Sequence, residues 1–302
     1  MGAMNASARP RASLALALVL VLAACSGGAG SSGNQIPHPS GDELVLRVES
    51  RGGLMMPDFL FTSLPSFTLL GDGRVIVPGA MMEIFPGPAL PPVDVRQLTE
   101  AGVQTILRAV AATGQFASSA EWRGAQNFVA DAGDTVFTLN AEGRTVTISI
   151  YGLGTFSADD PPPNLPAAEV PVHRALSRLL EQLTAPEAWL PAAAWARQTP
   201  QPYVADALRL LVRNADADPP DESGIANVEL PWPTADDPAA FGQPALGGDY
   251  RCGVVADDAA ASWYASLSNA NQLTRFTKDG HRYQVSVRPL LPDEPRECPS
   301  QT

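Results

Sequence analysis

Two cysteines near the C-terminus are the residues of this chain whose type and spacing most clearly indicate a chemical reaction. Cys252 and Cys298 are separated by 45 intervening residues, and no histidine lies next to either of them. In an extracytoplasmic protein such an even pair is typically a disulfide, although two free thiols or a pair of metal ligands would give the same pattern. A bridge would raise the free energy of unfolding by about 4 kcal/mol in the chain-entropy model. We expect it to hold the proline-rich tail against the last part of the body.

A third cysteine, Cys25, follows the apolar run "LVLVLAA" and precedes the flexible stretch "SGGAGSSG". Arg9 and Arg11 stand before this run, as in a secretory signal, and the run is too short for an ordinary membrane span. The four residues Leu22-Ala23-Ala24-Cys25 resemble the lipobox of bacterial lipoprotein precursors, and the resemblance covers residues 1–25 only. It implies cleavage before Cys25, a lipid on the Cys25 thiol, and a place on the extracytoplasmic face of the cell membrane. The other interpretation is an ordinary cleaved signal with an incidental cysteine.

Catalytic side chains with recognisable spacing are scarce. The chain has three histidines, His38, His173 and His281, and lacks the G-x-S-x-G, H-E-x-x-H, C-x-x-C and phosphate-loop motifs. A histidine-based hydrolase would need His173 or His281 beside a serine that no motif identifies. We therefore predict no catalytic residue and no cofactor.

One acidic segment has the alternation of a calcium loop. Asn214, Asp216 and Asp218 occupy alternate positions, where oxygen ligands would stand. The sixth position of such a loop needs glycine and the twelfth a glutamate, but the chain has Pro219 and Ile225 there. The segment is better interpreted as a solvated acidic loop, so we predict no metal site.

Apolar residues give the most distinctive pattern. All four methionines that follow Cys25 lie in two segments, "GGLMMPDFLF" and "GAMMEIFPG", on either side of a predicted hairpin. Methionine and phenylalanine on irregular backbone form adaptable surfaces for a lipid, a peptide or a protein partner. The alternative, which the apolar character of these residues favours, is that both segments fold inward and cap the core. The candidate apolar binding surface consists of Met55, Met56, Phe59, Met81, Met82 and Phe85.

The overall charge restricts the partners. The formal net charge is −12, and removal of residues 1–24, which hold two arginines and no acid, makes it −14. Nucleic-acid binding depends on neutralising phosphates, so this acidity argues against it. It also argues against a body that lies on anionic lipid headgroups.

Three hairpins share one turn chemistry. They are predicted over residues 66–79, 134–152 and 274–289, and their turns contain Asp72-Gly73, Glu142-Gly143 and Asp279-Gly280. Glycine supplies the positive φ that tight hairpins require, so the acidic residues at these turns need no catalytic explanation. A strand from Glu43 should join the first hairpin.

Helical periodicity recurs between the hairpins. It predicts helices over residues 94–113, 172–183, 203–212 and 257–269, the first with a capping box of Asp94 and Gln97. Residues 190–248 otherwise show little strand pattern. Because hairpins dominate, we predict an α+β fold of antiparallel hairpins packed with helices, as one large domain or two small subdomains.

The predicted organisation has four parts. These are a signal peptide at 1–24, a flexible tether at 25–41, an α+β region with two hairpins and two helices at 42–185, and a helical connection with a disulfide-closed α+β region at 186–302. The first functional hypothesis is a non-catalytic envelope binding or interaction module, anchored to the membrane through Cys25. The others are an envelope hydrolase and a carrier of a small apolar ligand.

Overall fold

The computed structural model describes residues 1–2, 35–81, 83–127, 129–219 and 224–299. The chain divides into two units, Met1–Gln35 and Ile36–Thr302, and the fold below is that of the second unit. The expected signal peptide, Cys25 and Met82 lie outside the described residues. Among the residues that are described, no helix combines the length and apolar character needed to cross a membrane.

The first half of the body forms an eight-stranded sheet in the order β5-β7-β6-β1-β2-β3-β4-β8. Neighbouring strands are antiparallel except the edge pair β5–β7. Alternation of buried and less buried residues along strands such as β4 and β7 places one set of side chains in the core. The strands are β1 (Leu44–Arg51), β2 (Phe67–Leu70), β3 (Arg74–Pro78), β4 (Val93–Leu98), β5 (Ala120–Trp122), β6 (Asp134–Ala141), β7 (Arg144–Tyr151) and β8 (Trp195–Pro202).

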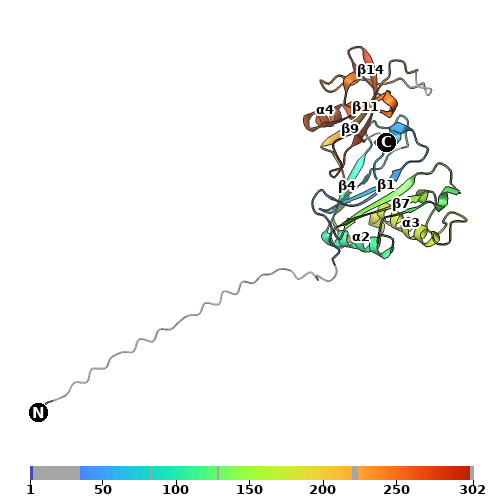
Figure 1. The fold of residues 1–302 in the computed structure, drawn as a ribbon. Coiled ribbons are helices and arrows are strands. Elements are labelled where there is room, and N and C mark those ends of the chain that lie inside the picture. The colour runs from blue at the N-terminus through green and yellow to red at the C-terminus, as the bar shows by residue number, and fades with distance from the viewer. Residues whose placement is uncertain (3–34, 82, 128, 220–223, 300–302) are drawn as a thin grey trace. The chain divides into compact units, whose positions relative to one another are not determined.

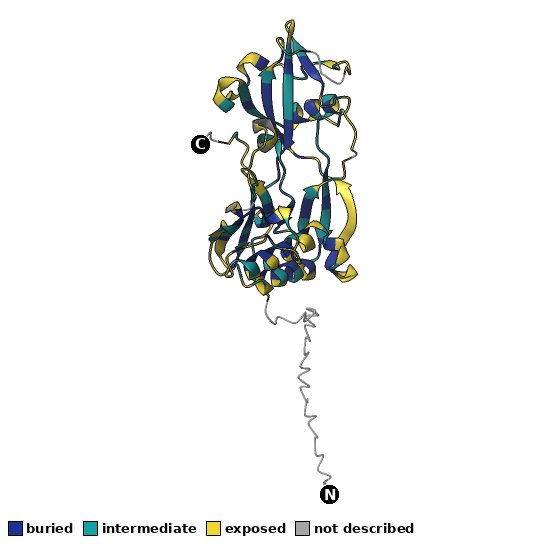
Figure 2. Ribbon diagram, turned by 90° about the vertical axis from the view of Figure 1, so that its right-hand side faces the viewer, coloured by how far each residue is buried: buried dark blue, intermediate teal, exposed yellow. Residues whose placement is uncertain are grey.

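Two helices cover one face of this sheet, α2 (Glu100–Ala112) and α3 (Val170–Thr184) (Figure 1). Thr99 caps α2, since its hydroxyl oxygen accepts a hydrogen bond from the Gly102 N–H at 3.3 Å. The buried stripe of each helix packs on strand residues such as Phe67, Phe137 and Ile148. Buried residues therefore concentrate in the strands and on the inner helix faces (Figure 2).

The second half forms a six-stranded sheet in the order β10-β13-β14-β9-β12-β11. Helix α4 (Asp257–Leu267) packs on it through Trp263, whose ring meets that of Trp232 edge-on with centroids 4.8 Å apart. All pairings are antiparallel except β10–β13. The strands are β9 (Ala207–Asn214), β10 (Glu229–Pro231), β11 (Gln243–Ala245), β12 (Tyr250–Ala256), β13 (Arg275–Lys278) and β14 (His281–Pro289).

A short helix, α1 (Pro57–Thr62), belongs to the first half of the chain but packs on the second sheet. Phe61 packs in a cluster with Leu211 and Cys252 of the second sheet, although α1 precedes β2 of the first. In return, Leu291 from the C-terminal segment packs with Leu70 and Ile76 of the first sheet. The short 3-10 helices are η1 (Gly124–Asn127), η2 (Leu153–Thr155), η3 (Pro186–Ala188), η4 (Ala192–Ala194), η5 (Pro238–Ala240) and η6 (Leu246–Gly248).

The predicted α+β class is confirmed, and all three hairpins are present as β2–β3, β6–β7 and β13–β14. The predicted strand after Glu43 is β1, which pairs with β2 as expected. The helices predicted at 172–183 and 257–269 correspond to α3 and α4.

Two predicted helices are wrong in whole or in part. Val93 and Val95 belong to strand β4, and the helix begins only after Thr99, so Asp94 and Gln97 form no capping box. The helix predicted at 203–212 is strand β9, which lies between β14 and β12 and is buried on both faces. A strand buried on both faces loses its alternation and resembles a buried helix in sequence. The described part of residues 190–248 accordingly contains four strands rather than a surface connection.

Candidate functional site

The predicted disulfide is present. Cys252 on β12 bonds to Cys298 with a Cα–Cα distance of 6.0 Å, and Cys252 is buried. The bridge fixes the C-terminal segment against the face of the second sheet that also receives Phe61. Its location next to packed side chains indicates a structural role.

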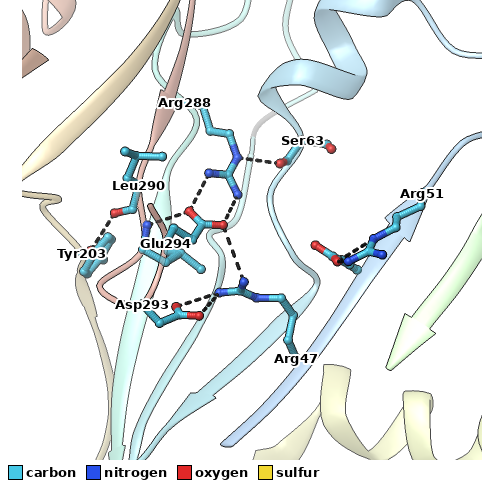
Figure 3. A network of polar contacts seen from close by, with 10 residues as sticks. Arg47, Arg51, Ser63, Tyr203, Arg288, Leu290, Asp293 and Glu294 are labelled. Atoms are coloured by element: carbon cyan, nitrogen blue, oxygen red, sulfur yellow. Dashed lines mark hydrogen bonds and ion pairs between the residues drawn. The ribbon is translucent and has the colours of Figure 1, made fainter. Parts of the chain in front are cut away.

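A buried network of ion pairs holds the same segment (Figure 3). Arg47 on β1 donates two hydrogen bonds to Asp293, at 2.8 and 2.9 Å, and Arg288 on β14 donates two to Glu294, at 2.6 and 2.7 Å. The Arg288 Nε also donates to the Ser63 carbonyl oxygen at 2.9 Å. These bonds connect strands of both sheets with the end of α1.

The network shifts the pKa values of its two carboxylates in opposite directions. Burial raises the pKa of Glu294, but hydrogen bonds and charge from Arg288 outweigh it, so this pKa lies below its ordinary value. Burial raises the pKa of Asp293 despite Arg47. Arg209 lies opposite Arg288 in the β9–β14 ladder, and burial together with the Arg288 charge lowers the Arg209 pKa. Apart from the buried Arg47 Nε, which has no partner among the described residues, the bonds of these guanidinium groups go to carboxylates and carbonyls, so the network is a structural clamp.

Each of the three histidines lies within hydrogen-bond reach of another polar side chain. His38 Nε2 lies 3.2 Å from the exposed carboxylate of Glu100, whereas His173 has a buried partner. Ser177 Oγ lies 3.3 Å from His173 Nδ1, one helical turn along α3. Both residues are buried, and desolvation by burial lowers the pKa of His173. The ring packs edge-on against Phe156, and Nε2 has no hydrogen-bond partner among the described residues. No substrate can reach the pair without opening the core.

His281 stands at the tip of the β13–β14 hairpin. Its Nδ1 lies 2.7 Å from Asp216 Oδ2, and the side chain is largely exposed. The hydrogen bond to His281, with those from the Arg282 backbone and Asn214, lowers the pKa of Asp216 to about 2. No serine, threonine or cysteine of the described chain bonds to His281. The arrangement ties the acidic loop to the hairpin.

Arginine side chains bind the other aspartate of the acidic loop. Asp218 receives two hydrogen bonds from Arg213, at 2.6 and 2.9 Å, and lies 3.3 Å from Arg275. The loop is therefore held by arginines rather than merely solvated. Within the described ranges, no group of three or more His, Cys, Asp or Glu side chains could hold a metal ion.

The methionine and phenylalanine segments lie on the surface. Met55, Met56, Phe59, Met81 and Phe85 are between 46% and 71% exposed, so these side chains do not cap the core. The structure separates them into two groups. Phe59, Met81 and Phe85 lie around one groove, whereas Met55 and Met56 do not line it.

This groove, called the β14 groove here, has a volume of about 630 Å³ and runs beside strand β14. Such a volume falls in the usual range for ligand sites. One wall comes from α1 and the residues after it, another from the segment between β3 and β4, and a third from the turn before β13. The lining residues are Phe59, Thr62, Ser63, Leu64, Pro78, Met81, Phe85, Pro88, Ala89, Pro91, Asn271, Gln272, Leu273, Gln284, Val285, Ser286 and Val287.

Hydrogen bonds fix the walls of the groove. Gln272 Oε1 accepts from the Gly87 N–H at 3.0 Å, and the Gln272 N–H donates to the Gly87 carbonyl at 3.0 Å. The Ala89 N–H also donates to the Ala270 carbonyl at 3.3 Å. At the opposite wall, the bond from Arg288 to Ser63 holds the end of α1 beside β14. The groove is thus formed before any ligand arrives.

The lining has an unusual composition for this chain. None of the described lining residues is an acid, an arginine, a lysine or a histidine, although the chain holds 52 acidic and basic residues. Apolar side chains alternate with amides and hydroxyls, such as those of Gln272 and Ser286. A site of this kind favours an uncharged molecule that has both apolar parts and hydrogen-bonding groups.

Sequence reasoning identified three of the rim residues but not the groove itself. Gln272, Gln284 and Ser286 carry no motif, and they meet Met81 and Phe85 only because two sheets come together. The proline-rich segment "FPGPALPP", which begins at Phe85, was the one signal available, since proline fixes loops that position side chains.

Comparisons with known proteins find no match, whether with family models, with curated proteins or with solved structures. The argument about function therefore depends on the residues of this chain and on the geometry described above.

Proposed function

We propose that this protein is a lipid-anchored lipoprotein of the extracytoplasmic face of the cell membrane, whose body is a non-catalytic binding module. The lipobox-like residues ending at Cys25 support the anchor and the location. The disulfide between Cys252 and Cys298 is consistent with an oxidising compartment.

One observation carries the binding role. The β14 groove is preformed, uncharged and rimmed by the exposed side chains of Met81 and Phe85, in a protein whose net charge is −12. Exposed apolar side chains around a concave site mark ligand or partner binding more often than chance exposure does.

A hydrolase is less well supported. The His173–Ser177 pair has suitable atoms but is buried in the core between α3 and its neighbours, and His281 bonds to Asp216 without a nucleophile beside it. Chemistry at either position would need a substrate within hydrogen-bond reach. The β14 groove offers that access but holds none of these groups.

A photo-crosslinker placed at single positions tests the binding role. We would replace Phe85 by p-benzoylphenylalanine in the full chain and irradiate the membranes of its own cells. Met56, which is 71% exposed but does not line the groove, is the matched control position. The proposal predicts a discrete adduct from position 85 that is absent from position 56. Equal adducts at both positions, or none at 85, would contradict it.

A further inference from the structure

Strand β14 is paired along most of its length on one side only. Its residues Tyr283–Pro289 pair with β9 from Asn214 to Leu208. On the other side, β13 pairs only with His281–Tyr283. Beyond that point the chain before β13 turns away, since the Thr274 N–H donates to the Asn271 carbonyl at 3.0 Å. In the described chain, no strand pairs with this side of Gln284–Val287.

The hairpin geometry shows which backbone groups face that open side. A two-residue turn, Asp279-Gly280 with both φ positive, makes Lys278 and His281 a hydrogen-bonded pair, and the bonds then recur at every second residue. The backbone groups of Arg282 point the opposite way, toward β9, because the Arg282 carbonyl accepts a hydrogen bond from the Ala215 N–H, which follows β9. By this alternation, the N–H and C=O groups of Val285 and Val287 point to the unpaired side of β14. Both residues line the β14 groove, Val285 partly exposed and Val287 buried.

These four backbone groups have no hydrogen-bond partner on that side among the described residues. They lie at the base of a groove whose lining includes all four residues Gln284–Val287. A row of unpaired strand groups is a template for another extended backbone.

We propose that an extended, uncharged peptide segment of a partner protein adds as a further strand to β14 beside Gln284–Val287. This rests on the proposed function, because it names the class of ligand for the same groove. Four residues of strand span about 13 Å, so the segment pairs over about four residues. Its alternate side chains would face the apolar rim at Met81 and Phe85 and the lining on the opposite side.

The backbone groups decide between a peptide and an acyl chain. A hydrocarbon tail would fill the apolar part of the groove but would cut the N–H and C=O of the partly exposed Val285 off from water without giving them partners. Buried and unpaired backbone groups are strongly disfavoured. A peptide satisfies them and covers the same apolar side chains. The uncharged lining excludes segments with charged side chains facing inward, since those would lose hydration without gaining a partner.

The test uses two peptide pools and the full chain carrying Cys25→Ala, which changes no described residue. The first pool contains hexapeptides random over Val, Leu, Phe, Ser, Thr and Gln. The second has the same composition but carries an N-methyl group on every backbone nitrogen. Methylation removes peptide donors while it keeps the side chains. Neutral monolauroylglycerol serves as the acyl probe.

We expect the first pool to bind and to shift the amide resonances of Val285 and Val287. Methylation should weaken binding by about tenfold or more, because two hydrogen bonds are lost. Met81→Glu should weaken binding, whereas Met55→Glu, on an exposed side chain outside the groove, should not.

Other outcomes overturn the inference in different ways. If both pools bind equally, the backbone edge is not used. If only monolauroylglycerol binds, with shifts around Met81 and Phe85, the groove is a binding site but for lipid, so the proposed function stands without this inference. If no probe binds at millimolar concentration, both proposals fail.

Discussion

Arg288 on β14 and Glu294 on the C-terminal segment form a two-point ion pair, with N–O distances of 2.6 and 2.7 Å, and each side chain is less than a tenth exposed. Glu294 also accepts a hydrogen bond from the Leu291 N–H at 2.9 Å. Because Arg288 holds Ser63 as well, this pair sets the position of α1 beside the β14 groove.

Replacing one partner of this pair should be costly. Glu294→Gln leaves the buried Arg288 guanidinium without a counter-charge, so we expect the free energy of unfolding to fall by about 3–5 kcal/mol. The control is Glu49→Gln, whose partner Arg51 is exposed, and the expected loss there is below about 1 kcal/mol. Denaturant unfolding followed by circular dichroism measures both. Similar losses in the two variants would refute the role of the Arg288–Glu294 pair.

The acidic loop should show a defined pH response. Asp216 has a pKa of about 2, below its ordinary value, because it accepts a hydrogen bond from His281 and further bonds from the Arg282 backbone and Asn214. A depressed carboxyl pKa gives stability that is present above about pH 4 and is lost as the pH falls toward 2. Carboxyl carbon NMR should place the Asp216 midpoint near pH 2, and His281→Ala should raise it. A midpoint near 4 in the unaltered protein would show that these bonds do not form.

A matched pair of methionine variants separates the groove from the rest of the surface. Met81 and Met55 are 62% and 46% exposed, so glutamate at either position should change stability by about 0.5 kcal/mol or less. Only Met81 lines the β14 groove. Met81→Glu should therefore reduce the fluorescence of the neutral apolar dye Nile red on the protein, while Met55→Glu leaves it unchanged. Equal effects would mean that the dye reports general surface apolarity.

The lipid anchor gives a prediction for the cell. Cys25→Ala removes the thiol that the lipobox resemblance assigns to the lipid, so the protein should move from the membrane fraction to the soluble fraction. Fractionation with immunoblotting measures the change, and Cys252→Ala serves as a cysteine control that should stay membrane-bound. If the Cys25→Ala protein remains fully with the membrane, the anchor lies elsewhere.

Local sequence rules predicted the hairpins because the residues of each turn favour the turn conformation by themselves. Asp279-Gly280 adopts two positive φ angles, and the flanking β-branched residues need no distant partner to define the strands. The disulfide was predictable for a similar reason, since only one cysteine pair remained after Cys25.

The two wrong helix predictions have their cause in the tertiary structure. Strand β9 lies in the centre of its sheet, so Leu208, Leu210 and Leu211 are all buried and show no alternation. The end of β4 adjoins α2 directly at Thr99, and Val95 and Leu98 happen to continue the helical spacing of the following residues. In each case the spacing of apolar residues resembled helical periodicity, because two elements adjoin there or because both faces of a strand are buried.

The groove could not be predicted for a further reason. Met81 and Phe85 belong to the first sheet's connections, while Gln272 and Val285 belong to the second sheet and lie about 190 residues later in the chain. Only the packing of the two sheets, fixed by buried pairs such as Arg47–Asp293, brings these residues together. The open edge of β14 also depends on where the chain before β13 turns away. The sequence "NANQLTR" contains no motif that predicts this turn.

Amide hydrogen exchange at Val285 and Ser286 tests the open edge of β14 most directly. The Ser286 N–H points toward β9 and bonds within the β9–β14 ladder, so it should exchange slowly. The Val285 N–H should exchange much faster in the free protein and slow down when the hexapeptide pool binds. If Val285 in the free protein is as well protected as Ser286, its N–H already has a partner, and the edge that we assign to a partner strand is closed.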